Sequence, residues 1–134
     1  MRWFGREKAV EVWDEAIQWP LGDIEAAERI RNICRSAADS ADFIGGSSAR
    51  AEDNRKAAPK QHEAESARYQ RAARAAMEIA MRLQDALMRD AAVREIVDLC
   101  LKARDLKTAR ILFRAIQSPS IHDPMLIEHP ELRQ

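Results

Sequence analysis

Between Gln61 and Ser118 the chain contains neither glycine nor proline, and this long interval constrains its fold more than any other feature. Both residue types interrupt helices, so their absence favours helical structure. Apolar residues recur here at helical spacing, but the apolar stripe changes direction twice, beside Asp90 and beside Asp105. An aspartate side chain can accept hydrogen bonds from the first N–H groups of a helix, so both residues mark candidate helix starts. We therefore predict three helices, near residues 61–89, 91–104 and 106–117.

Two more helices are predicted before this interval. Residues 6–19 place apolar side chains on about half of a helical circumference. A Trp-Pro-Leu-Gly sequence at 19–22 ends this segment, because proline restricts the residue before it and glycine favours a turn. Asp23 can then cap a helix over residues 24–44, which stops at a pair of glycines. The five segments predict an all-α, single-domain bundle of four to five helices within residues 1–117.

Two segments lack the helical pattern. Residues 45–60 contain no large apolar side chain, so burial cannot offset the entropy lost when they become ordered. We expect a mobile internal loop there. Residues 118–134 carry several prolines and no helical repeat, so we expect an extended tail outside the bundle.

The charge balance limits the classes of partner. The chain has 22 basic and 22 acidic side chains and a formal net charge of zero, which argues against a dedicated nucleic-acid or anionic-membrane binder. No stretch is apolar enough to span a bilayer, and residues 1–6 lack the apolar core of an export signal. We expect a cytoplasmic protein, in which Cys34 and Cys100 remain free, buried thiols.

Three methionines carry the most informative pattern for function. Met77, Met81 and Met88 lie nearly opposite Ile79 and Leu83 when residues 61–89 are drawn as one helix. A helix with two apolar faces is either packed on both sides or bears an interface, and methionine suits adaptable surfaces. Three interpretations follow: contact with the rest of the chain, self-association, or a groove for a helix of another protein. Self-association makes a homodimer possible.

The two ends of the chain supply further candidate contact residues. Trp3 and Phe4 lie among basic residues near the N-terminus, where packing on the bundle is a plainer explanation than membrane contact. Met125, Leu126 and Ile127 form a short apolar cluster in the predicted tail. We include all five residues among the candidate interaction sites.

Arginines form a further stripe on the predicted long helix. They could follow a phosphate backbone, which gives a nucleic-acid-associated regulator as the alternative function. Glu78 and Asp85 interrupt the stripe at spacings that favour ion pairs, so a solvated face explains it better. The stripe consists of Arg68, Arg71, Arg82 and Arg89.

No motif indicates catalysis. The chain has no nucleophile elbow, no glycine-rich phosphate loop and no Glu-x-x-His pair of a helical metal site, so we expect no enzyme, no cofactor and no metal. The sequence favours a non-enzymatic helical module for protein–protein interaction: an adaptor, an inhibitor or a small assembly subunit. The identity of the partner protein cannot be read from the sequence.

Overall fold

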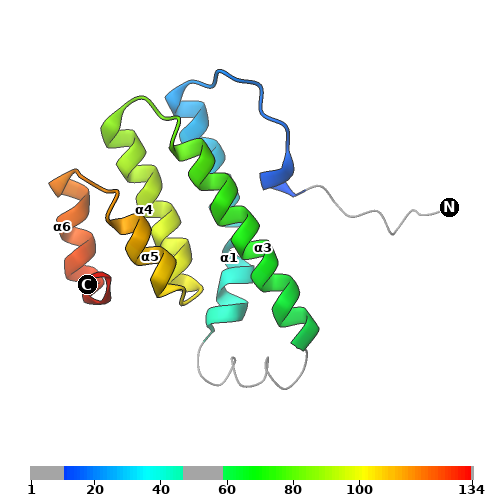
Figure 1. Cartoon of the computed structure of the whole chain (residues 1–134). Helices are drawn as coiled ribbons and strands as arrows, with labels where there is room; N and C mark the ends of the chain where they lie inside the picture. The colour runs from blue at the N-terminus through cyan, green and yellow to red at the C-terminus, as the bar shows by residue number, and fades with distance from the viewer. Residues whose placement is uncertain (1–10, 47–58, 134) are drawn as a thin grey trace.

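The structure is a computed structural model and describes residues 11–46 and 59–133 (Figure 1). Within these ranges the chain forms helices joined by short turns. The α-helices are α1 (Asp23–Gly45), α3 (Pro59–Ala80), α4 (Ala86–Lys102), α5 (Leu106–Phe113) and α6 (Pro119–Glu128). Two 3-10 helices, η2 (Val12–Asp14) and η3 (Pro130–Leu132), lie before and after them. The predicted all-α bundle of four to five helices is confirmed.

Successive helices run in alternating directions, with α1 behind α3 and α4, as Figure 1 shows. α5 packs on α4, and α6 lies beyond it at the edge of the bundle. One hydrophobic core joins all five helices, and its largest fully buried apolar side chains are Ile30, Ile33, Ile96, Val97 and Met125. No helix within the described ranges combines the length and apolar content that a membrane span requires.

Small residues allow the closest helix approach. Gly45 is buried at the end of α1, where a Cβ atom would overlap the carbonyl oxygen of Lys102 at the end of α4. Alanines such as Ala37, Ala72 and Ala76 are fully buried where α1 meets α3. Small side chains therefore let the backbones of neighbouring helices approach closely within the core.

The helix predicted over residues 6–19 is wrong for the residues that the structure describes. Residues 11–22 form only the short η2 and otherwise irregular chain. Figure 1 shows that this segment passes the end of α3 before it reaches α1. Tertiary contacts replace the local helix. Trp13 is buried beneath the guanidinium of Arg68, 5.0 Å from the ring centroid, and the same guanidinium holds both oxygens of Glu11 at 2.8 and 3.1 Å.

The break in the long interval lies earlier than predicted. α3 ends at Ala80 and α4 begins at Ala86, so the helices predicted at 61–89 and 91–104 have the wrong boundary. Asp85 is the residue that caps α4, accepting from the Met88 N–H at 2.9 Å. Leu83 is buried within the turn. Leu83 therefore stays in the core although the helix has ended before it.

The side chain of Asp23 bonds to the turn between α3 and α4 rather than to its own helix, α1. Gly22 holds the cap position of α1, and the Asp23 carboxylate accepts from the backbone N–H groups of Gln84 and Asp85 at 2.9 and 2.8 Å. These two donors favour the charged carboxylate and lower the pKa of Asp23. The prediction that Asp23 caps its own helix is therefore wrong, because its carboxylate bonds to the turn before α4.

The extended tail predicted over residues 118–134 is also wrong, because most of it forms α6 and η3. Pro119 stands in the first turn of α6, where a missing N–H costs no helical hydrogen bond. Asp90, predicted to cap α4, lies buried inside α4 and accepts from the Gln117 and Ser118 N–H groups at 3.2 and 2.8 Å. Met125 and Leu132 then join the main core.

Two further predictions have different outcomes. Cys34 and Cys100 are free thiols, as expected, with Cys100 buried and Cys34 half-buried. The predicted loop at 45–60 falls mostly outside the described residues, which resume at Pro59, the first residue of α3.

Candidate functional site

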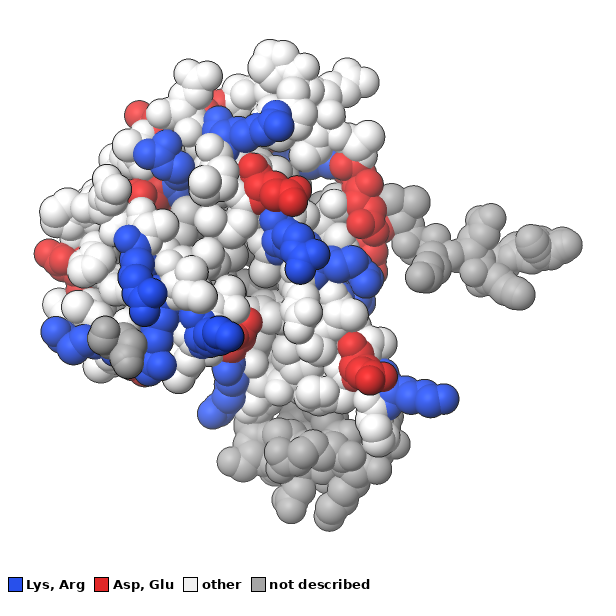
Figure 2. Space-filling view, viewed as in Figure 1, with Lys and Arg blue, Asp and Glu red and all other residues white. Residues whose placement is uncertain are grey.

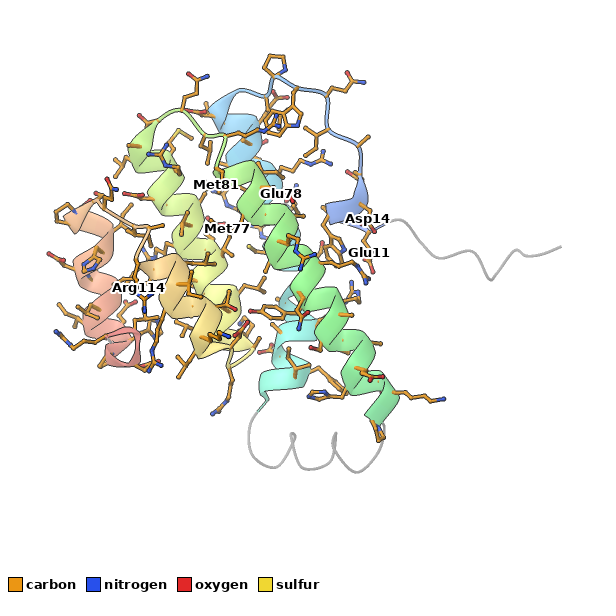
Figure 3. The ribbon with its side chains drawn as sticks, viewed as in Figure 1. Glu11, Asp14, Met77, Glu78, Met81 and Arg114 are labelled. Carbon is orange, nitrogen blue, oxygen red and sulfur yellow. The ribbon has the colours of Figure 1, made fainter. Side chains whose placement is uncertain are left out.

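A groove between α3 and α5 is the hollow most suited to a macromolecular ligand. Its volume is about 500 Å³. Polar and apolar side chains from both helices line it: Tyr69, Gln70, Ala73, Arg74, Met77, Asp105, Thr108 and Leu112. Figure 3 shows Met77 and Met81 on the side of α3 that faces α4 and α5. The groove exists because α5 packs on α4 and leaves this side of α3 open.

One hydrogen bond closes the groove at the end where α5 begins. The Tyr69 hydroxyl donates to Asp105 Oδ2 at 2.7 Å, while Asp105 Oδ1 accepts from the Thr108 N–H at 3.3 Å. Asp105 thus caps α5, as predicted, and also ties α5 to α3. Burial is the main cause that raises the pKa of Tyr69, followed by its contacts with Cys100 and Asp105. The Tyr69–Asp105 hydrogen bond therefore links α3 to the start of α5, and the polar atoms of both side chains already have hydrogen-bond partners.

Apolar side chains form part of the remaining groove, beside the polar residues Gln70, Arg74 and Thr108. Ala73 is buried at its base, and Met77 and Leu112 are half-buried on opposite walls. Two exposed apolar side chains lie outside this lining, at the ends or on the surface of the same two elements: Met81, 70% exposed just after α3, and Ile111, 52% exposed on α5. We call Met77, Met81, Ile111 and Leu112 together the apolar strip.

Cations flank the apolar strip. Figure 2 shows lysine and arginine side chains over α5 and over α3, with uncharged residues between them. Arg74 lines the groove from α3, and Lys107 and Arg114 are exposed on α5. Within the described residues these three side chains form no ion pair.

The structure separates the three candidate methionines. Met77 lines the groove, whereas Met81 is exposed just after α3 and is not part of the groove lining. Met88 lies in the first turn of α4, where it lines a different hollow with Leu21 and Ile24. The single stripe predicted from one long helix is therefore divided by the turn at residues 81–85.

The predicted tail cluster is divided as well. Met125 is 1% exposed and belongs to the core, whereas Leu126 is half-buried and Ile127 is 80% exposed. Only Ile127 of the three presents its side chain fully to solvent. Trp3 and Phe4 lie outside the described residues.

The predicted arginine stripe does not form one continuous surface. Arg68 holds Glu11 and is close to Glu65, Arg82 covers the Trp19 ring at 4.4 Å, and Arg89 donates to the Leu83 carbonyl at 3.1 Å. These three cations contact their own chain. Arg71 is exposed on α3.

The other hollows offer less. The largest, near His129, has a volume of about 1000 Å³ and is lined mainly by charged residues, including Asp98 and Glu128. Burial raises the pKa of Asp98. Within the described part of the chain, no three His, Cys, Asp or Glu side chains lie together in a way that could hold a metal ion. A small hollow of about 130 Å³ lies between Trp13, Trp19 and Arg29.

Several groove residues were missed by sequence reasoning. Leu112 was assigned to the core stripe of its helix, and Arg74, Thr108 and Ile111 were not singled out. Ile111 offered the available signal, because it is a large apolar residue outside the stripe formed by Ala109, Phe113 and Ile116. That Ile111 and Met77 lie on neighbouring elements could not be read from the sequence, because it depends on how α5 packs on α4 next to α3.

Comparison with known proteins finds no matching family model, no matching curated protein and no matching solved structure.

Proposed function

We propose that this protein is a non-enzymatic helical module that binds a segment of another protein in the groove between α3 and α5. The observation that carries this proposal is the open apolar strip of Met77, Met81, Ile111 and Leu112 on two adjacent helical elements. Methionine side chains adapt to different partners because they are unbranched and flexible. An amphipathic helix laid along such a strip would bury its apolar face, which is a common mode of peptide recognition.

The groove chemistry favours binding over catalysis. Its one carboxylate, Asp105, is already bonded to Tyr69 and to the Thr108 N–H. A general acid or base needs a group free to exchange a proton with a substrate. Tyr69 is buried, and its raised pKa opposes ionisation.

The alternative function, a nucleic-acid-associated regulator, has weaker support. It depended on a continuous arginine surface, and Arg68, Arg82 and Arg89 instead contact their own chain. We keep it as an outcome of the binding experiments.

The test is a selection of random displayed peptides against the full chain, which favours no charge or sequence in advance. The selected peptides are then mapped on the protein by backbone amide chemical shifts. We expect the shifted residues to cluster on α3 and α5. Selection without binders, or shifts confined to other helices, would contradict the proposal.

A matched pair of variants makes the test specific. Met77→Glu places a charge in the groove wall, and Ile24→Glu places one on an equally apolar side chain that lines a different hollow. Both substitutions affect side chains with access to solvent, so circular dichroism should show folded proteins. We expect Met77→Glu to abolish peptide binding and Ile24→Glu to leave it unchanged. Equal loss in both variants would mean that the groove is not the site.

A further inference from the structure

We infer that the partner segment is acidic: an amphipathic helix with one apolar face and carboxylates along its flanks. The inference rests on the proposed function, because it assigns the chemistry of the ligand in the same α3–α5 groove. It adds what the apolar strip alone does not specify, namely the sign of the charge that the partner carries.

The distribution of charge supports an acidic partner. The whole chain is neutral, yet residues 106–114 on α5 hold Lys107, Arg110 and Arg114 and no acidic residue. The Arg110 Nε donates to a backbone carbonyl, that of Glu131, at 2.8 Å, so no carboxylate neutralises it there. Arg74 adds a fourth cation from α3. Positive potential therefore gathers beside the apolar strip, where it would attract and orient a negative segment.

Two acidic residues lie nearby, against the four cations Lys107, Arg110, Arg114 and Arg74, so the local balance of charge stays positive. Asp105 accepts hydrogen bonds from the Tyr69 hydroxyl and the Thr108 N–H. Glu78 lines the separate hollow that contains Trp13 and Trp19. Figure 3 shows Glu78 and Arg114 on opposite sides of Met77, with Arg114 on α5.

The same charges argue against a second copy of this chain as the occupant. In a symmetric dimer each surface meets an identical surface. The cations Lys107 and Arg114 of both copies would then lie in one interface, which doubles its positive charge, and like charges there oppose association. An acidic partner converts this repulsion into attraction.

Nucleic acid would also bring negative charge, but the groove lacks the features that recognise it. Proteins that bind single strands stack the bases on accessible aromatic rings. The one aromatic ring that lines this groove, Tyr69, is 2% exposed. The strip between the cations consists of methionine and aliphatic side chains, which fit the apolar face of a helix.

The experiment compares three synthetic helical peptides of equal length with the same leucine face and with glutamate, glutamine or lysine at the flanking positions. Binding to the full chain is measured by fluorescence anisotropy at low and at high salt. We expect the glutamate peptide to bind about tenfold more tightly than the glutamine peptide, and the lysine peptide to bind most weakly. Raising the salt concentration should remove most of the difference, because exposed charges are screened.

Charge reversal on the protein supplies the matched control. The Arg74→Glu/Arg114→Glu variant should lose affinity for the glutamate peptide about tenfold and gain affinity for the lysine peptide. Arg35→Glu, an exposed cation on α1 that does not line the groove, should change neither. Retained folding of each variant is checked by circular dichroism.

The outcomes separate this inference from the proposed function. Equal binding of the glutamate and glutamine peptides, with shifts on α3 and α5, would overturn the acidic partner and leave the interaction groove in place. No binding by any peptide, or shifts elsewhere, would overturn both. A single-stranded oligonucleotide of equal charge that binds as tightly as the glutamate peptide, with the same Arg74 and Arg114 dependence, would also overturn the inference and favour nucleic acid.

Discussion

Cys100 is buried in the core and Cys34 is half-buried against it. Burial is the main cause that raises the pKa of Cys34 to about 12 and that of Cys100 to about 11, from an ordinary value of 9.0. The neutral thiol is therefore favoured by folding. In the unfolded chain the same groups lose their protons at lower pH.

This difference predicts a loss of stability in alkali. Above about pH 9 the unfolded chain binds fewer protons than the folded protein, so the free energy of unfolding falls as the pH rises. The loss is complete when the pH passes the folded values of about 11 and about 12. Urea unfolding at a series of pH values measures the decline. The Cys34→Ala/Cys100→Ala variant should show a shallower decline, and an unchanged slope would contradict the assignment to the thiols.

The side chain of Asp90 connects α4 to the start of α6. Its carboxylate, on α4, accepts from Ser118 and Gln117 ahead of α6. We expect Asp90→Ala to lower the free energy of unfolding by about 1 kcal/mol, in the range of a lost cap. Asp90→Asn keeps one acceptor oxygen and should lose less. Hydrogen exchange should speed up across residues 119–128 in Asp90→Ala, and unchanged exchange there would show that Asp90 does not hold α6.

At the scale of elements, helical periodicity identified helices more reliably than it identified their ends. Residues 24–44 correspond closely to α1, and Asp105 was correctly placed at the start of α5. The break between α3 and α4 was predicted too late in the chain, because Asp85 and Asp90 are both credible caps in the sequence. In the structure Asp85 caps α4, and the Asp23 carboxylate bonds to the turn before it.

The C-terminal helix provides a sharp test of element packing. Met125 is buried in the core while Ile127, two residues later, is 80% exposed. Met125→Ala should lower the free energy of unfolding by about 2–4 kcal/mol, through lost burial and a residual cavity. Ile127→Ala should change it by less than about 0.5 kcal/mol. Urea unfolding compares the two, and similar effects would mean that α6 does not pack as described.

At the scale of the whole molecule, self-association stays a prediction. The cations beside the α3–α5 groove oppose a symmetric dimer through that face. We therefore expect Met77→Glu to leave the solution mass unchanged over a series of protein concentrations, as measured by light scattering. A wild-type dimer that Met77→Glu converts into a folded monomer would contradict this and place a second copy on the groove.

The sequence by itself determined the helical class of the molecule and much of its core. Ile30, Ile79, Ile96 and Ala109 follow helical spacing and are buried, because periodicity depends only on the geometry of the single helix. It also indicated that Met77 and Met81 stand apart from that core stripe.

Only the tertiary structure decided how the helices contact one another. Residues 11–19 abandon their local helical pattern since burial of Trp13 and the Glu11–Arg68 pair outweigh it. The proline-containing tail forms α6, held at its start by the Asp90 carboxylate, which accepts from the N–H groups of Gln117 and Ser118, and by the burial of Met125 in the core. The groove itself joins α3 to α5 across more than a helix of intervening chain, and no local pattern specifies such a pairing. Local periodicity determines which residues share a face of a helix, whereas long-range packing determines which other elements each face contacts.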